Sequence, residues 1–264
     1  MPDIVVLGID AAWTLKAPSG IALIAGSPGV MGLVAVEGSY AEFSGGDANT
    51  GPAHQPDVGL MLQACRDRVG RSPNLIAIDM PLATHPITGR RASDNAVSSA
   101  YGAYRCGTHS PSAERPGSIS DRLRLDFSQD GFGLATSTPF ERCLIEVYPH
   151  PALVELLGAS ERLKYKVGKL RAYWPGAEPS VRRRQMVEVW ARIVDALEAN
   201  VTGVAAMMPL PSSDAPGRDL KRYEDMLDAV VCAWVGVMAL QGRCTPYGNE
   251  ESAIWIPTRR QPEN

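Results

Sequence analysis

The sequence predicts an α/β fold in which a mixed sheet is covered by helices on both faces. Three short apolar runs each end in one carboxylate: Ile4–Asp10, Leu75–Asp79 and Cys143–Glu146. Unbroken apolar runs of this length are typical of strands that helices cover on both sides. Helical apolar patterns lie between and after these runs, so we expect the element order β-β-β-α-β-α-β-α.

The N-terminal strands are expected to form an antiparallel meander. Two further apolar runs, Ile21–Ile24 and Leu33–Val36, follow the first strand after the turn sequences Ala17–Gly20 and Ser27–Gly29. These links are too short for the crossover that parallel neighbours need. Residues 45–56 are rich in Gly, Pro, Asn and Asp, which indicates a loop.

The rest of the chain alternates helical patterns with further strands. A helix capped by Asp57 is expected to run to Val69 and to return the chain alongside the first strand. Residues 82–140 are irregular and lack apolar mass of their own, so we interpret them as an inserted cover over a functional site. Residues 1–264 are therefore expected to form a single domain. Further helices are expected at 94–104, 151–157, 161–173, 181–199 and 219–240, and a short final strand at 254–256.

Composition and charge exclude several classes of protein. The 264 residues are 45% hydrophobic and 21% charged, which suits a chain with a proper core and not a disordered one. The net charge of −3 gives no general attraction to nucleic acid or anionic membranes, so binding nucleic acid would need a local basic patch. The longest apolar stretch, Ala229–Leu240, is too short to span a bilayer, and we expect no membrane partner.

The cysteines indicate a reducing compartment. The five cysteines are odd in number, and no two have Cys-x-x-Cys spacing. Cys143 and Cys232 lie inside apolar runs, as buried thiols do. No signal-peptide pattern begins the sequence. These features together predict a cytoplasmic protein.

The acids at the strand ends predict a metal site. Open α/β sheets bind ligands at the carboxyl ends of their strands, where Asp10, Asp79 and Glu146 would meet. Asp228 is a fourth candidate carboxylate. It adjoins the nearly all-apolar part of the last helix, so we expect its side chain to be at least partly buried. Carboxylate oxygens suit Mg²⁺ or Mn²⁺, and two such ions about 4 Å apart activate water for phosphodiester cleavage. The alternative is that each acid only caps a helix or binds an arginine.

Two further acids precede Asp228 on the last helix. Glu224 and Asp225 stand four and three residues before it and therefore share a helix face with it. The helix dipole favours acids in a first turn, and we interpret these two as solvated residues of that kind.

Basic residues near the acids are candidate substrate ligands. Arg90 and Arg91 lie beyond the second of the three acidic strands and could bind a phosphate, or Arg91 could form a helix-surface pair with Asp94. Lys164 and Lys166 follow the third such strand and could meet a scissile phosphate, or they belong to an ordinary solvated face.

Four other features are open to two interpretations. His109 and His150 could transfer protons, although the Pro-His-Pro sequence around His150 also suits a rigid turn. Trp13 could stack on a base, but a position in the wall of the core is the interpretation we favour. The basic cluster Arg182–Arg184 could contact a nucleic-acid backbone, yet three arginines at a helix start more often lie on the surface.

Short motifs spread over nearly the whole chain form a recognisable set. They are Gly8–Thr14 with Pro18–Gly20, Ile78–Leu82, Gly89–Arg91 with Asp94, Ile145–Pro151, Tyr165–Lys166 and Asp225–Ala229. In this order they resemble the uncharacterised bacterial and archaeal family called domain of unknown function 429 (DUF429). The resemblance implies a ribonuclease H-like fold and a nuclease similar to Holliday-junction resolvases. In such enzymes the first strand, a later strand and a late helix supply the acids, which here implies Asp10, Asp79 or Glu146, and Asp228.

We therefore expect a hydrolase that cleaves nucleic acid with Mg²⁺ or Mn²⁺ held by these acids. One alternative is a non-catalytic scaffold in which the acids are hydrogen-bonded inside the protein. Another is an actin-like phosphotransferase, which would need a second copy of the fold that this chain is too short to hold. No P-loop, Rossmann or nucleophile-elbow motif follows a strand. The resemblance also allows a homodimer.

Overall fold

The computed structural model describes residues 2–46 and 55–258, and its centre is an eight-stranded mixed sheet. The strands run in the order β3-β2-β1-β4-β6-β8-β7, and β5 pairs with β6 outside this path. The strands are β1 (Ile4–Asp10), β2 (Gly20–Ser27), β3 (Val30–Glu37), β4 (Leu75–Ile78), β5 (Gly133–Leu134), β6 (Cys143–Val147), β7 (Cys244–Gly248) and β8 (Ala253–Pro257).

Strand pairing confirms the N-terminal meander and brings the carboxyl ends of the next strands together. β1 pairs antiparallel with β2, and β2 pairs antiparallel with β3. β1, β4, β6 and β8 are mutually parallel neighbours. The register places Ile9 beside Ile78 and Ile78 beside Glu146, and the Asp79 amide donates to the Ile9 carbonyl at 2.8 Å. The three strand-end acids therefore lie along one edge of the sheet.

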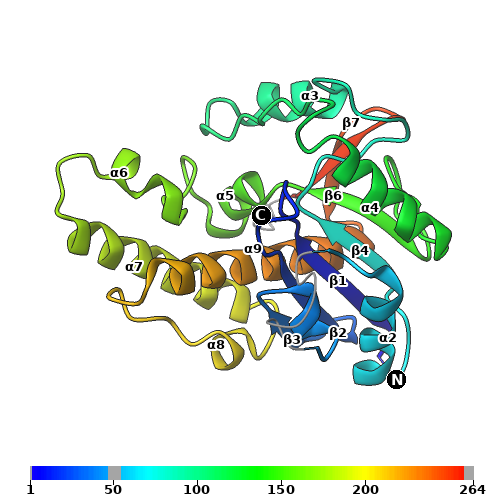
Figure 1. Cartoon of the computed structure of the whole chain (residues 1–264), viewed down its shortest axis with the longest axis horizontal. Coiled ribbons are helices and arrows are strands. Elements are labelled where there is room, and N and C mark those ends of the chain that lie inside the picture. The colour runs from blue at the N-terminus through cyan, green and yellow to red at the C-terminus, as the bar shows by residue number, and fades with distance from the viewer. Residues whose placement is uncertain (1, 47–54, 259–264) are drawn as a thin grey trace, which may run out of the picture.

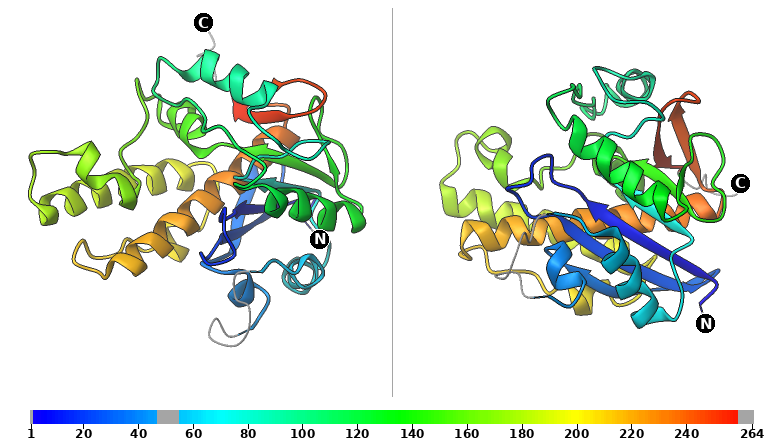
Figure 2. Two further views of the ribbon diagram at one scale, coloured as in Figure 1. Left: turned by 45° about the horizontal axis from the view of Figure 1, so that its top comes forward. Right: turned by 45° about the vertical axis from the view of Figure 1, so that its right-hand side comes forward.

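Helices cover both faces of the sheet, as expected (Figures 1 and 2). The long α9 lies against β1, β2 and β4 on one face, where α5 and α7 complete the layer, whereas α2 and α4 cover the other face. The helices are α1 (Tyr40–Phe43), α2 (Val58–Val69), α3 (Ala92–Tyr101), α4 (Ser118–Gln129), α5 (Pro149–Leu157), the 3₁₀ turn η1 (Val167–Lys169), α6 (Leu170–Tyr173), α7 (Pro179–Glu198), α8 (Val204–Met207) and α9 (Gly217–Leu240).

The backbone of α9 touches the sheet at two glycines. A Cβ atom on Gly8 would stand 2.3 Å from the Ala229 carbonyl oxygen, and one on Gly20 would stand 2.0 Å from the Asp225 carbonyl oxygen. Real Cβ contacts are never this short, so only glycine fits at either position. This close approach brings the acids of α9 beside the end of β1.

A Gly8→Ala substitution is expected to destabilise the protein, because the added methyl group must push α9 away from β1. Overpacking of this kind costs about 1–3 kcal/mol in the free energy of unfolding. Urea unfolding of Gly176→Ala serves as the control, since a Cβ there meets no atom within 4 Å. Equal unfolding midpoints for the two variants would contradict the contact.

The helix expected at 161–173 is wrong in its first half. Only η1 and the short α6 are helical, and Lys166 has an extended backbone at φ −84° and ψ 123°. Tertiary contacts explain the difference: Tyr165 is buried and donates to Asp228, and the Val167 amide donates to Glu224. These contacts with α9 outweigh the local helical pattern.

The inserted cover at 82–140 is more structured than its sequence suggests, and its buried apolar residues join cores that other parts of the chain also form. The helix expected at 94–104 is present as α3, which begins and ends slightly earlier. The cover also contains α4 and β5, which we did not expect from the sequence. Leu123, Phe127 and Phe132 are buried and belong to the core under α2. Leu123 and Phe127 are four residues apart in a mostly polar helix, which gives a narrow apolar stripe that is easy to overlook.

Several remaining expectations are also tested by the fold. Strand β7 was not expected, and it adds an antiparallel edge beside β8. The loop expected at 45–56 lies mostly outside the described residues, which omit 47–54. All five cysteines are free, and Cys143 and Cys232 are buried as expected. In the described part of the chain, no helix has both the length and the apolar character needed to cross a bilayer.

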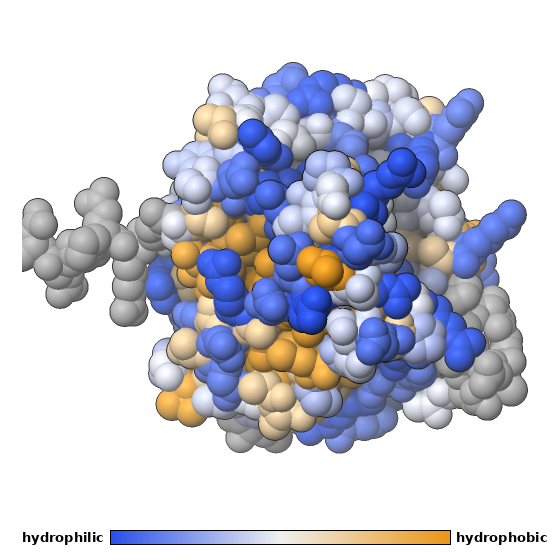
Figure 3. Space-filling view, turned by 90° about the vertical axis from the view of Figure 1, so that its left-hand side faces the viewer, coloured by the Kyte–Doolittle hydropathy of each residue, from blue (hydrophilic) through white to orange (hydrophobic). Residues whose placement is uncertain are grey.

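The end of the molecule formed by α6, α7 and the start of α9 has both apolar and hydrophilic side chains on its surface. Figure 3 shows hydrophobic residues between hydrophilic ones on this face. Partly buried apolar side chains of this layer, Leu170, Trp174, Val187 and Met226, pack at the margin of the main core. The layer is therefore a thin extension of the core.

Candidate functional site

A pocket of about 350 Å³ opens at the carboxyl ends of β1 and β4. Asp10 and Asp79 stand at the strand ends, and the loop after β1 supplies one wall. The Ala12 amide donates to Ser19 Oγ at 3.0 Å, which ties the two ends of that loop together. The charged and aromatic residues that line the pocket are Asp10, Trp13, Asp79, Arg115, Lys166, Lys221 and Asp225.

The two strand-end aspartates hold protons more tightly than usual. Burial raises the pKa of Asp10, and the nearby Asp228, Asp225 and Asp79 carboxylates raise it further, although Lys166 opposes them. Burial likewise raises the pKa of Asp79 to about 7, with Lys166 acting against it and Asp228 with it. The pocket is therefore an unfavourable place for these negative charges.

Helix α9 contributes three more acids, and all three are buried rather than solvated. Glu224, Asp225 and Asp228 are 2%, 4% and 0% exposed. The interpretation of Glu224 and Asp225 as solvated first-turn acids is therefore wrong, because α9 begins at Gly217 and these residues lie deeper in the helix, against the sheet.

Two lysines partner these acids. Lys166 contacts Asp228 and lies 3.5 Å from Glu224 Oε1, while Lys221 contacts Asp225 and lies 2.7 Å from the same Glu224 oxygen. Burial disfavours the charged Lys166 ammonium, but Asp228, Tyr165, Asp10 and Glu224 together outweigh burial and raise the pKa of Lys166.

Negative charge exceeds positive charge in this cluster, which we call the acid cluster. It consists of five carboxylates and two ammonium groups: Asp10, Asp79, Glu224, Asp225, Asp228, Lys166 and Lys221. Oxygen ligands of this type suit a hard divalent cation. Within residues 2–46 and 55–258, however, no three His, Cys, Asp or Glu side chains are already arranged around a metal position. An ion could enter only if the lysine ammonium groups moved away from the carboxylates.

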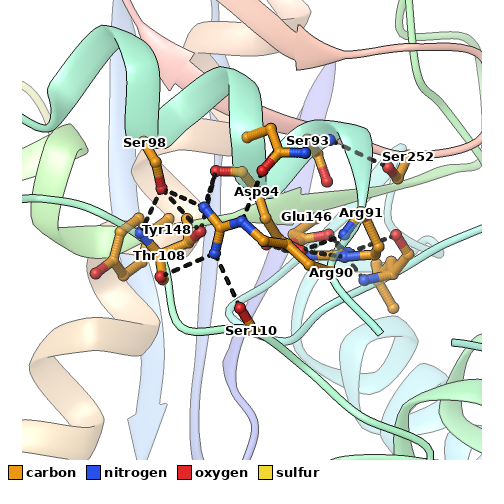
Figure 4. A network of polar contacts seen from close by, with 12 residues as sticks. Arg90, Arg91, Ser93, Asp94, Ser98, Thr108, Ser110, Glu146, Tyr148 and Ser252 are labelled. Carbon is orange, nitrogen blue, oxygen red and sulfur yellow. Dashed lines mark hydrogen bonds and ion pairs between the residues drawn. The ribbon is translucent and has the colours of Figure 1, made fainter. Parts of the chain in front are cut away.

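Glu146 is bound by an arginine (Figure 4), and it lies near enough to Asp79 to help raise the pKa of that carboxyl. Arg91 donates to both carboxylate oxygens of Glu146, at 2.5 and 2.8 Å, and the Leu82 amide donates to it at 2.8 Å. Asp94 accepts from the other side of the guanidinium at 2.9 Å. Burial disfavours the charged guanidinium, but Glu146 and Asp94 outweigh burial and raise the pKa of Arg91.

The two arginines considered for phosphate binding both have partners within the protein. Arg91 forms a pair with Asp94, which was one of the two alternatives, but the pair is buried and not on the helix surface. Arg90 donates to Asn95, Ser98 and Ser110 side chains and to the Asp94 and Thr108 carbonyls, so its guanidinium holds the cover together (Figure 4).

Of the two candidate lysines, Lys166 lines the pocket. Lys164 is half-buried two residues away and is not among the described residues that line the pocket.

Comparison with known proteins identifies a family. The family model described as "Protein of unknown function (DUF429)" matches residues 8–252, which is most of the chain and includes the whole acid cluster. The chain belongs to the DUF429 family. No curated protein and no solved structure matches it.

The two histidines near the site of this DUF429 protein differ in environment. His150 is buried between the rings of Tyr148 and Tyr165, and its Nδ1 has no hydrogen-bond partner among the described residues. Burial and the nearby Lys166 lower its pKa, so the imidazole is neutral at physiological pH. His109 is exposed on the cover and lines a second, smaller pocket.

Some residues of the DUF429 site were not singled out from the sequence. Lys221 and Arg115 line the pocket, and neither was among the candidates taken from the sequence. The spacing of four between Lys221 and Asp225 is a detectable signal, because residues at that distance meet on a helix. Arg115 has no such local signal. Trp13 packs against the core, as we favoured, and it also lines the pocket. Its stacking on a base stays a prediction.

Proposed function

We propose that this protein is a phosphodiesterase that uses Mg²⁺ or Mn²⁺ to hydrolyse nucleic acid. The observation that carries the proposal is the excess of buried carboxylates over lysines in the acid cluster. Burial and mutual repulsion raise the pKa values of Asp10 and Asp79. A divalent cation would relieve this repulsion, and oxygen-rich sites of this kind bind such cations.

The carboxylates that would hold the ions are Asp10, Asp79, Asp225 and Asp228. Asp79 is favoured over Glu146 because Asp79 lines the pocket, whereas both Glu146 oxygens are bonded to Arg91. When bound, the ions would activate water and stabilise the leaving oxygen of a phosphodiester.

The protein's own residues would then bind the substrate. Lys166 and Lys221, once the ions replace them at the carboxylates, can pair with phosphate oxygens in the same pocket. Arg115 is exposed at the pocket and adds a third cation. These three positive side chains are the cations that would pair with the phosphates of a nucleic acid in the pocket.

The topology supports a ribonuclease H-like fold for this proposal. The antiparallel β3-β2-β1 meander is followed by the parallel strands β4 and β6, and a late helix returns acids to β1. The resemblance of the motifs to DUF429 implies acids on the first strand, a later strand and a late helix. Asp10, Asp79 and Asp228 stand at these three places.

A non-catalytic scaffold is the competing function, and one observation favours it. The α9 acids and Glu146 already have partners of opposite charge inside the protein. A scaffold of this kind would not need an ion, so metal binding separates the two functions.

The test of the proposed function is calorimetric titration with Mn²⁺ at pH 8, beside cleavage of single-stranded, duplex and branched nucleic acid. Wild type is expected to bind Mn²⁺, and Asp79→Asn is expected to bind at least about tenfold more weakly. The control is Asp219→Asn, which removes an exposed acid from the same helix as Asp225 and Asp228. Absence of Mn²⁺ binding by wild type would favour the scaffold.

The Mn²⁺ affinity is also expected to depend on pH. Asp79 has a pKa of about 7, so below pH 7 the metal must displace a proton from it. We expect the affinity to fall at least about tenfold per pH unit below pH 7, because Asp10 also holds its proton more tightly than usual. Calorimetry at pH 5.5, 6.5, 7.5 and 8.5 measures this slope, and a flat profile would show that Asp79 is not a ligand.

A further inference from the structure

We propose that this protein takes one unpaired nucleotide into its site, with the base against Trp13 and Tyr148 and the phosphate toward Lys166. The proposal names the substrate class of the proposed hydrolase. Its claim about the reaction rests on the proposed function. The binding itself follows from two adjoining pockets with different chemistry. Trp13 and Asp79 line both of them.

The smaller pocket has the walls of a base-binding site. Trp13 and Tyr148 supply aromatic surfaces, and Pro81, Val147 and Ile254 supply aliphatic ones. Its other walls include the charged side chains Arg91, Asp94 and Glu146, which are paired with one another. Every nucleobase has a π-face that can stack on aromatic side chains, so this contact does not depend on which base is present. The Tyr148 hydroxyl donates to the Gly107 carbonyl at 3.3 Å, which fixes the ring against the cover.

The size of this pocket fits a single ring system. Its volume of about 50 Å³ holds roughly three to five water molecules. One planar base displaces about that much water, whereas a base pair or a stacked duplex step is far larger. The nucleotide that enters must therefore be unpaired, as in a single strand, a loop or a flipped position.

The edge of the pocket offers hydrogen bonds to such a base. Thr108 and His109 lie on the loop after α3, and both line the pocket. Thr108 Oγ1 donates to the Asp94 carbonyl at 3.1 Å, and Figure 4 shows Thr108 near Tyr148. His109 is exposed, and its imidazole can donate or accept according to its tautomer.

The larger pocket contains three cations that can meet a phosphate, beside the carboxylates Asp10, Asp79 and Asp225. Lys166, Lys221 and Arg115 line it, and Asp79 joins it to the smaller pocket. A nucleotide whose base contacts Trp13 on one side would extend its phosphate toward these cations and toward the proposed metal ligands. The base of one nucleotide thus matches the aromatic walls of the smaller pocket, and its phosphate matches the cations of the larger pocket.

The test compares two ligands that differ by a base, uridine 5′-monophosphate and ribose 5-phosphate, by calorimetry with EDTA and again with Mn²⁺. Wild type is expected to bind the nucleotide at least about tenfold more tightly, because stacking contributes that much per base. In Trp13→Leu the ratio is expected to fall to about threefold or less, while the affinity for ribose 5-phosphate stays the same. Trp13→Phe is expected to restore most of the ratio, and it provides a second variant with an aromatic ring.

The outcomes separate this inference from the proposed function. Equal affinity of wild type for the two ligands, or an unchanged ratio in Trp13→Leu, would overturn the nucleotide site even if Mn²⁺ binds. A base preference that Trp13→Leu removes would support the site even if no Mn²⁺ binds and hydrolysis is refuted. Arg115→Gln is the matched control, expected to weaken both ligands by the same factor and to leave the ratio unchanged.

Discussion

An Asp10→Asn variant is expected to lose Mn²⁺ affinity and phosphodiester cleavage by about 100-fold or more, and yet to be more stable than wild type without metal. The loss follows from removing a charged oxygen ligand at the end of β1. The gain follows from the raised pKa of Asp10, which shows that its charge is unfavourable in the folded protein. These opposite effects on function and stability distinguish a metal ligand from a structural carboxylate.

The sign of the stability effect depends on pH. The folded protein holds the Asp10 proton more tightly than the unfolded chain does, so the free energy of unfolding falls as pH rises from about 4 through the raised pKa. The neutral amide of the Asp10→Asn variant would not carry this penalty. Urea unfolding of both proteins in EDTA at pH 5 and pH 8 measures it, with Asp219→Asn as the exposed control. A variant that is less stable than wild type at pH 8 would contradict the repulsion.

Replacing Arg91 with alanine is expected to lower the free energy of unfolding by about 3–5 kcal/mol. Removing one member of a buried ion pair leaves the other charge uncompensated. Here two buried carboxylates, Glu146 and Asp94, would lose their common partner, and the Leu82 carbonyl would lose a donor at 2.7 Å. Chemical denaturation measures the change, and a loss below about 1 kcal/mol would contradict this role.

Glu146→Gln provides the comparison for Arg91→Ala. It leaves Arg91 paired with Asp94, so we expect a smaller loss of stability than in Arg91→Ala. We also expect the Mn²⁺ affinity of Glu146→Gln to match that of wild type. If this variant lost the metal instead, Glu146 and not Asp79 would be the ligand from the central strands.

The sheet was predictable from the sequence because its strands carry their signal locally. The apolar runs of β1, β4 and β6 are unbroken, and the short turns before β2 and β3 allow only an antiparallel meander. The N-terminal cap of α2 was predictable for the same reason, because the capping residue and its partner are three residues apart. Asp57 accepts a hydrogen bond from the Leu60 amide at 2.9 Å.

The candidate site was predictable only in part, because the partner of an acid can lie far away in the sequence. Nothing in the sequence near Glu146 indicates that Arg91, 55 residues earlier, takes both of its oxygens. The burial of Asp225 depends on where α9 meets β2, and local helical periodicity does not specify that contact. The prediction for the 161–166 segment failed for the same reason, since its conformation is set by hydrogen bonds to α9.

The distances between the acids are set by two positions that have no side chain. Gly8 and Gly20 allow main chain to meet main chain, so Asp10 and the carboxylates of α9 are held at a separation that no rotamer change elsewhere can adjust. Chemistry at this edge of the sheet thus depends on residues that supply no chemical group. Two residues without a reactive group thus make the meeting of the reactive side chains possible.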